Sequence, residues 1–250
     1  MDRDELSFHA HAARPIAAPV GDEAVDALLS QLQVTGGGRV LDVGCGSGEW
    51  LLRLALRTTG LTGVGVDRSG WMMVAARSRA MQLGLSDRLQ FVQGNAAGFL
   101  SEQPPHFDAA LCIGSSHALG GPVSCLKTLH RLPRLETVLF GESHWQATPT
   151  PAALEALGAG PEDLPDLERL RATARDAGFD VTHERTSDQE EWDAYERAWC
   201  EGLEQFAAAA PEGERAQAAR AAAEGHRQAY LNGYRGVLGF TVLVLRRARR

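Results

Sequence analysis

The chain has 250 residues, of which 44% are hydrophobic, so it is long enough to bury a substantial core. Its net charge of −7 speaks against a nucleic-acid partner, which Lys and Arg would have to attract, and favours a small-molecule substrate. The sequence has no C-x-x-C pair, so we expect no metal site and no disulfide. No apolar run approaches the length of about 18 residues that a membrane span needs, so we expect a cytoplasmic protein without a membrane partner.

Short apolar runs bounded by turn residues alternate with helical patterns along most of the chain. This alternation is typical of a parallel sheet with helices on both faces. We therefore predict an α/β fold with a doubly wound, mostly parallel, seven-stranded sheet. The strands are expected at 39–43, 62–67, 89–93, 107–113, 137–141, 179–184 and 237–246, and the main helices at 22–32, 47–58, 69–83, 123–132 and 167–177.

Two regions lie outside this regular pattern. Residues 1–38 form an N-terminal lead and a helix, and residues 187–235 read as two helices separated by Pro211-Glu212-Gly213. Because ligands of open α/β sheets bind at the carboxyl ends of the strands, either region can close over the site. The helical pair can equally pack on the sheet or pair two subunits, so a monomer or a homodimer is expected. The remaining divisions are a core at 39–186 and a final strand with a basic tail at 236–250.

A glycine-rich segment follows the first strand and opens a helix. It contains Gly44, Cys45, Gly46 and Gly48. Glycine is needed where a loop turns sharply and a ligand approaches the backbone closely. A dinucleotide loop would have its third glycine at the position of Glu49, so the G-x-G-x-G spacing opposes a nicotinamide dehydrogenase.

Two carboxylates flank this loop. Asp42 precedes it, where it would repel a phosphate but can accept hydrogen bonds from an amino group or water. Asp67 ends the second strand, nineteen residues beyond Gly48, where a carboxylate can accept from both hydroxyls of a ribose. Together the loop and the acids indicate a nucleoside ligand without a pyrophosphate.

On these residues, the stretch from Arg39 to Gly141 resembles a class I, Rossmann-like methyltransferase that uses S-adenosylmethionine (SAM), of the bacterial small-molecule type. The resemblance implies that SAM is the methyl donor and S-adenosylhomocysteine (SAH) the product. It assigns the methionine end of SAM to the glycine loop, the ribose to the acid of the second strand, the adenine to residues after the third strand, and the methyl to the fourth strand end. The cofactor residues so assigned are Asp42, Gly44, Cys45, Gly46, Gly48, Asp67, Arg68, Asn95, Ala96, Cys112 and Ile113.

The chain departs from the pattern of this family at two places. Asn95 stands where the family usually has an aspartate that reads the adenine amino group, but its amide oxygen can accept the same hydrogen bond. Leu132-Pro133-Arg134 replaces a Pro-Gly-Gly turn before the fifth strand.

Methyl transfer from a sulfonium is an in-line displacement in which the leaving sulfur loses its positive charge. The protein must therefore position the acceptor and exclude water, and a base must remove any acceptor proton. His117, four residues past the fourth strand, is the first candidate base because imidazole titrates near neutrality, although it can instead hold its own loop. Glu142 and His144, just past the fifth strand, are the second candidates, or else ordinary rim residues.

Four aromatic residues can wall the acceptor pocket together with His117, although such stripes also serve helix packing. They are Trp145, Trp192, Tyr195 and Trp199, the last three at helical spacing. In the N-terminal lead, His9, His11 and Arg14 can fold over the cofactor.

The sequence thus predicts an enzyme that methylates a nitrogen or an oxygen of a small metabolite. An RNA methyltransferase is an alternative, although no basic face and no N-P-P-Y or cysteine nucleophile motif is visible. A regulatory protein that binds SAM without turnover is another, because the sequence does not fix the base.

Overall fold

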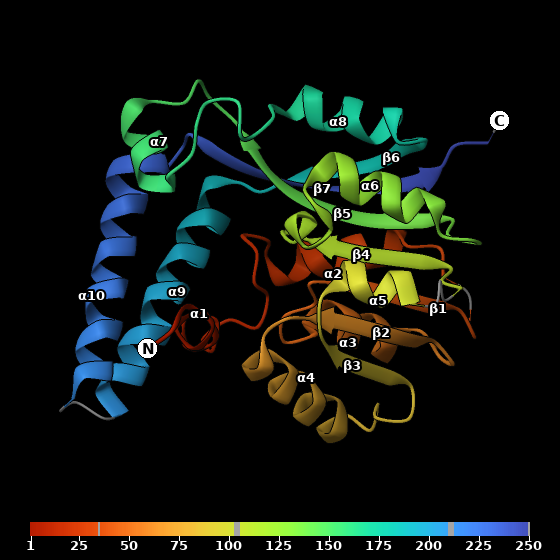
Figure 1. Cartoon of the computed structure of the whole chain (residues 1–250), viewed down its shortest axis with the longest axis horizontal. Helices are drawn as coiled ribbons and strands as arrows, with labels where there is room; N and C mark the ends of the chain where they lie inside the picture. Colours follow the sequence, from red (N-terminus) through yellow and green to blue (C-terminus); the bar gives the residue numbers. More distant parts are fainter. Residues whose placement is uncertain (35, 103–105, 210–212, 250) are drawn as a thin grey trace. The chain divides into compact units, whose positions relative to one another are not determined.

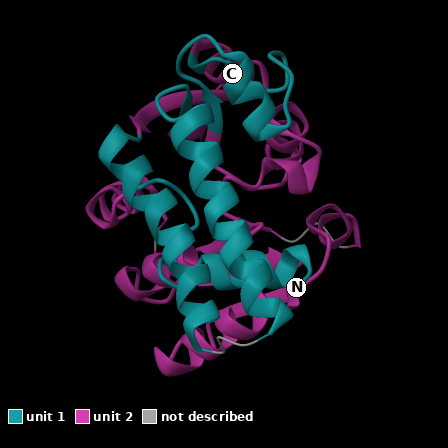
Figure 2. Cartoon of the chain, turned by 90° about the vertical axis from the view of Figure 1, so that its left-hand side faces the viewer, with its two compact units in different colours: residues 1–20, 143–167, 187–240 teal, residues 21–142, 168–186, 241–250 magenta. Residues whose placement is uncertain are grey.

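A computed structural model describes residues 1–34, 36–102, 106–209 and 213–249. These residues form two compact units, which Figure 2 shows in different colours. Unit 1 consists of residues 1–20, 143–167 and 187–240, and unit 2 of residues 21–142, 168–186 and 241–250. Three separate stretches of sequence therefore build unit 1.

The sheet has seven strands in the order β3-β2-β1-β4-β5-β7-β6 (Figure 1). Strands β1 to β4 pair in parallel, and so do β4 and β5, whereas β7 runs antiparallel to β6. The predicted doubly wound, mostly parallel sheet is confirmed. The strands are β1 (Arg39–Val43), β2 (Thr62–Asp67), β3 (Leu89–Gln93), β4 (Ala109–Ile113), β5 (Thr137–Trp145), β6 (Phe179–Thr186) and β7 (Leu238–Arg247).

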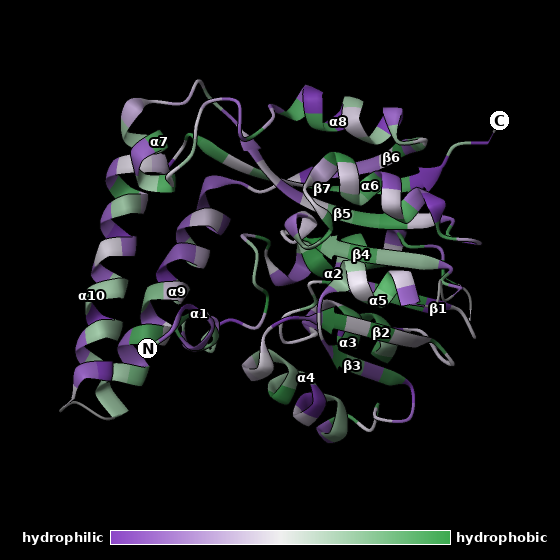
Figure 3. Cartoon of the chain, in the orientation of Figure 1, coloured by the Kyte–Doolittle hydropathy of each residue, from purple (hydrophilic) through white to green (hydrophobic). Residues whose placement is uncertain are grey.

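Helices cover both faces of the sheet in unit 2. In the view of Figure 1, α5 and α6 lie in front of the strands and α2 and α3 behind them. Strands buried on both faces need continuous apolar runs, and Figure 3 shows them largely in the green of hydrophobic residues. The helices are α2 (Asp22–Gln31), α3 (Glu49–Arg57), α4 (Gly70–Gln82), α5 (Ala96–Glu102), α6 (Pro122–Arg131) and α8 (Leu167–Asp176).

Unit 1 is mainly helical, with α1 (Arg3–Ala10), α7 (Pro151–Leu157), α9 (Gln189–Ala209) and α10 (Glu214–Ala229), which ends in a π-helical turn, η2 (Tyr230–Tyr234). Alanines let α9 and α10 approach closely around the buried Cys200 and Leu203. Gly202 admits α1, because a Cβ there would lie 2.6 Å from the Ala10 carbonyl oxygen. The two helices expected between β6 and β7 are thus confirmed, whereas Pro211 and Glu212 of the expected break lie outside the described residues.

Helices α1 and α7 were not predicted, and strand β5 was predicted too short, each for a local reason. The N-terminal lead contains α1, whose first turn is capped because the Asp2 carboxylate accepts from the Glu5 amide at 2.8 Å. The short helix α7 was missed, although Thr150 caps it through a 3.1 Å bond from the Ala153 amide. Strand β5 continues to Trp145, because its backbone amide finds an acceptor on Pro165 at 2.8 Å.

In the part of the chain that the structure describes, no helix has both the length and the apolar composition of a membrane-crossing segment.

Candidate functional site

The glycine loop between β1 and α3 is fixed by backbone hydrogen bonds to the end of β2. The amides of Gly44 and Cys45 donate to the Val66 carbonyl at 2.8 and 3.2 Å. The φ values are 63° for Gly44, 51° for Gly46 and 77° for Gly48. Residues other than glycine rarely adopt this left-handed region. The loop conformation therefore depends on all three glycines.

The three glycines differ in how much open space lies beside their Cα atoms, and this difference indicates where a ligand can bind. A Cβ at Gly44 would collide with the Ser115 side chain, and a Cβ at Gly48 would lie 2.5 Å from Cε1 of Phe91. At Gly46, by contrast, no heavy atom lies within 4 Å of the Cβ position. Gly44 and Gly48 thus pack against the protein, whereas Gly46 borders open space that a ligand can fill.

Asp67, at the end of β2, connects the loop to the next helix. Its Oδ2 accepts from the Gly46 amide and its Oδ1 from the Ser69 amide, both at 2.9 Å. A carboxylate oxygen can accept two hydrogen bonds, so each retains capacity for one ribose hydroxyl. Asp67 therefore also orders the loop, a role that sequence reasoning missed.

Asp42 is buried directly before the loop. Its side chain is 3% exposed, and its Oδ2 has no hydrogen-bond partner among the described residues. Burial, and second the nearby Asp67, raise the pKa of Asp42 well above its usual range. A cationic or N–H-bearing ligand group would lower the energetic cost of burying this carboxylate. The site therefore fits the amino group or the sulfonium of SAM.

Asn95 caps helix α5. Its amide oxygen accepts from the backbone amides of Ala97 and Gly98 at 2.8 and 3.3 Å, and Ala96 is buried behind it. The oxygen expected to read the adenine amine is thus already engaged, which leaves the side-chain NH2 group as a donor to a ligand. Arg68 is exposed.

The two cysteines assigned to the cofactor pack toward the interior of unit 2. A Cβ on Gly65 would lie 2.7 Å from Sγ of Cys45, and burial raises the pKa of this thiol well above its usual range. Sγ of Cys112 lies 3.6 Å from Sγ of Cys125. Because side chains alternate along a strand, Ile113 presents the other face of β4, and only the backbone of Cys112 can border a ligand there.

The loop after β4 is held by Ser115. Its hydroxyl donates to the Val43 carbonyl at the end of β1. His117 follows on a 3-10 turn, η1 (Ser116–Leu119), where it is exposed and its ring makes no hydrogen bond to any described residue. The ring therefore does not hold the loop, and it can act on a ligand.

A family model described as a methyltransferase domain matches residues 35–196, which is more than half of the chain. The chain belongs to this methyltransferase family. The resemblance to a class I SAM-dependent methyltransferase is thereby confirmed.

Three relatives illustrate the range of similarity to this methyltransferase. YjhP of Escherichia coli K12, described as uncharacterized, is 33% identical over 201 residues, 79% of this chain and 80% of YjhP. The crystal structure of a SAM-dependent methyltransferase from Geobacter sulfurreducens in complex with SAH has a TM-score of 0.87 at 31% identity, covering 99% and 98% of the two chains. The 27-O-demethylrifamycin SV methyltransferase of Amycolatopsis mediterranei is 27% identical over 190 residues, 72% of this chain and 66% of that one.

The second pair of candidate bases in the methyltransferase belongs to β5 itself rather than to a rim beyond it. Glu142 is half-buried in unit 2. His144, in unit 1, is 2% exposed, and its Cε1 would lie 2.6 Å from a Cβ on Gly239. Trp145 is also fixed inside unit 1, because its indole N–H donates to the Pro161 carbonyl at 2.8 Å.

The aromatic stripe of α9 divides into two parts. Trp199 stacks on His226 of α10 with ring centroids 3.8 Å apart, so it serves helix packing. Trp192 meets Tyr195 and Tyr234 edge to face, at 6.3 and 6.4 Å. Its indole Nε1 is buried and has no hydrogen-bond partner among the described residues.

Tyr195 is linked to the N-terminal segment of unit 1. His11 Nδ1 lies 2.8 Å from the Ser7 carbonyl oxygen, which can only accept, so Nδ1 carries the proton. The other ring nitrogen, Nε2, then accepts from the Tyr195 hydroxyl at 3.2 Å. Burial lowers the pKa of His11 and raises that of Tyr195, so both are neutral near pH 7.

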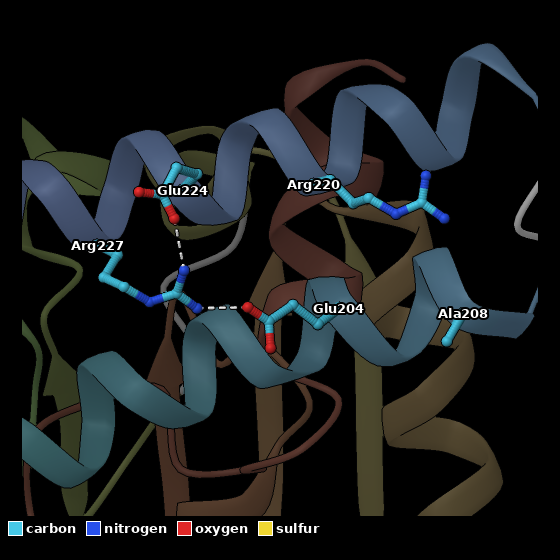
Figure 4. Close-up of a pocket in the computed structure, with 5 residues that line it drawn as sticks. All are labelled: Glu204, Ala208, Arg220, Glu224 and Arg227. Carbon is cyan, nitrogen blue, oxygen red and sulfur yellow. Dashed lines mark hydrogen bonds and ion pairs between the residues drawn. The ribbon is translucent and has the colours of Figure 1, made fainter.

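The charged groups elsewhere on α9 and α10 compensate each other. Glu196 is buried, with one oxygen accepting from the Tyr234 hydroxyl at 3.0 Å and the other paired with His226. Figure 4 shows a groove between the helices in which Arg227 pairs with Glu204 and Glu224. Within the described residues, no group of three or more His, Cys, Asp or Glu side chains is arranged to hold a metal ion.

Proposed function

We propose that this methyltransferase transfers the methyl group of SAM to a nitrogen or an oxygen of a small molecule. The observation that carries the donor assignment is the open space beside Gly46, bordered by a loop that Asp67 orders and preceded by the buried Asp42. The SAH complex of the Geobacter protein supports the same donor. The name of the rifamycin relative, an O-methyltransferase of a small molecule, supports the acceptor class.

The residues of unit 2 would hold SAM along the ends of β1, β2 and β4. The glycine loop would hold its methionine end, Asp67 would accept from the ribose hydroxyls, and the NH2 group of Asn95 would donate to the adenine ring. Asp42 supplies a negative charge to the cationic end of the donor, where burial strengthens the interaction. When bound, SAM supplies an electrophilic methyl group on a positively charged sulfur.

Proton removal from the acceptor is assigned to His117. The ring is exposed, follows the end of β4, and makes no hydrogen bond to a described residue, so a ring nitrogen can accept a proton. His144 is the weaker candidate because it is 2% exposed and packs against the β7 backbone. The main work of the protein is to position the acceptor in line with the sulfonium and to exclude water.

The net charge of −7 supports a small acceptor over RNA, because an acidic protein repels a phosphate backbone. We further propose, as the sequence suggested, that residues 1–38 and 187–235 serve the acceptor, as a lid and a cap.

Replacement of Asp67 by Ala tests the donor site. We expect SAM binding, measured by calorimetry, to weaken by about 1.5 to 3 kcal/mol, the scale of lost charge-assisted hydrogen bonds. The matched control is Asp87→Ala, which removes an exposed carboxylate of unit 2. Unchanged affinity in Asp67→Ala would remove this residue from the ribose, and binding of NAD in place of SAM would refute the proposed function.

A further inference from the structure

Two buried N–H donors of unit 1 have no acceptor in the described structure. They are Nε of Arg14, in the segment after α1, and Nε1 of Trp192, on α9. Trp192 is 6% exposed, so its indole N–H lies out of reach of bulk solvent. Burying a donor without a partner is unfavourable, and nearly all such groups in folded proteins are satisfied by protein, water or ligand. A ligand that brings acceptor atoms would satisfy both.

Tyr195 connects the two donors. Its ring meets the Trp192 ring edge to face, and its hydroxyl bonds to the ring of His11, whose carbonyl accepts from the Arg14 amide at 3.2 Å. The Tyr195 hydroxyl donates to His11, so its proton is already committed. The Arg14 guanidinium is held in place because Nη2 donates to the Val20 carbonyl at 2.6 Å.

The carboxylate of Glu196 does not accept a hydrogen bond from Nε of Arg14 or Nε1 of Trp192. Glu196, which acts on Tyr195 electrostatically, uses both oxygens internally, one for Tyr234 and the other for His226. The arrangement around Tyr195 therefore combines a guanidinium, an indole N–H and aromatic walls. A cation and a second N–H donor on a desolvated site fit an anionic oxygen pair, which a carboxylate supplies.

We propose that Arg14 and Trp192 bind the carboxylate of a small carboxylic acid. This site does not depend on the proposed function, because both residues belong to unit 1. A carboxylate is also present at the methionine end of SAM, and the experiment separates these two sources.

The test is a calorimetric titration of the whole chain with three acids and their amides, in the presence of saturating SAH. The pairs are benzoate and benzamide, 4-hydroxybenzoate and 4-hydroxybenzamide, and succinate and succinamide. We expect at least one acid to bind about tenfold or more tightly than its amide, because only the acid offers a charged oxygen pair. If no acid binds more tightly than its amide, the proposal is wrong.

Trp192→Phe sharpens the test, because it keeps an aromatic ring and deletes the unsatisfied donor together with the fused five-membered ring. We expect it to lose the preference for the acid about tenfold, and a modest fall in Tm is expected from the cavity that the smaller ring leaves. Arg14→Gln should lose the same preference by removing the charge. Trp71→Phe, on α4 of unit 2, is the matched control and should keep the preference.

The outcomes distinguish the competing assignments. Variants that retain the acid preference overturn the proposal, and variants that instead weaken SAM binding assign the carboxylate to SAM and overturn it as well. If the acids bind without SAH and the whole chain does not bind SAM, the proposed function fails while the carboxylate site stands. If SAM binds and the acids do not, only the carboxylate site fails.

Discussion

Asp42 keeps a carboxyl group in a buried position where it lacks a full set of partners. Its pKa is raised by burial, so the folded chain binds its proton more tightly than the unfolded chain does. Stability contributed by this proton is present at low pH and is lost as pH rises from about 4 toward the folded pKa. A group held at this expense is better explained by ligand binding than by folding.

Asp42→Asn should therefore separate stability from binding. We expect Tm at pH 7 to rise by about 2 °C or more, because a buried charge is removed, while SAM affinity falls about tenfold. Between pH 4 and pH 7, the free energy of unfolding should fall less in the variant than in the unchanged chain. Thermal unfolding at both pH values and calorimetry with SAM measure these effects, and a less stable variant with normal affinity would contradict them.

His117 is the residue on which proton removal depends in the proposed mechanism. We expect His117→Ala to lower kcat by roughly 100-fold while SAM affinity stays normal, because the ring contributes no hydrogen bond to the described structure. The rate of SAH formation with an active acceptor and calorimetry with SAM measure the two quantities. A fully active variant would mean that positioning alone drives the reaction.

At the scale of elements, the loop between β1 and α3 contains two glycines that serve different purposes. Gly46→Ala should fold, at a cost of about 1 kcal/mol for a side chain at positive φ, but its methyl group would enter the ligand space and weaken SAM binding about tenfold or more. Gly48→Ala should lower Tm more, because its methyl group collides with Phe91. Tm and SAM affinity measured for both variants would contradict this account if the two changed in parallel.

The elements themselves show what the sequence could predict. Strands β1, β2 and β3 were predicted to the residue, because each is a short segment between turn residues, with a mostly apolar run in β1 and apolar residues alternating with polar ones at the start of the edge strand β3. The short helices α1, α5 and α7 were missed, since each depends on one capping side chain rather than on a long periodic pattern. Arg134, in the segment that replaces the Pro-Gly-Gly turn expected from the resemblance, takes a left-handed conformation with φ 66°.

The candidate site divides in the same way. The residues proposed to bind the methyl donor lie near or shortly after the carboxyl ends of strands. The predicted doubly wound sheet therefore indicated that Asp42, Gly46 and Asp67 lie close together. The hydrogen bond of His11 to Tyr195 spans 184 positions, and no local pattern indicates such a pair. Likewise, no sequence pattern shows that the indole N–H of Trp192 lacks a partner.

At the scale of the whole molecule, unit 1 is assembled from three stretches of chain, so its integrity depends on links such as the one between His11 and Tyr195. Burial lowers the pKa of His11 below its usual 6.5, so the unfolded chain takes up this proton first as pH falls. The free energy of unfolding should therefore decrease as pH falls through 6.5 toward the folded pKa.

His11→Gln tests this dependence. The loss of Tm between pH 7 and pH 5 should be smaller in the variant than in the unchanged chain by a few degrees, because one of the groups that titrates differently in the two states is removed. An equal loss of Tm in both proteins would show that other groups cause the acid sensitivity.

The position of β7 between β5 and β6 has a consequence for how the protein is made. A ribosome completes β6 before it begins α9, yet the neighbour of β6 in the sheet is β7, which emerges about fifty residues later. During that interval β6 exposes an unpaired edge, and a chaperone or another nascent chain can bind it. Translation speed through α9 and α10 therefore sets how long the newborn enzyme is open to misassembly.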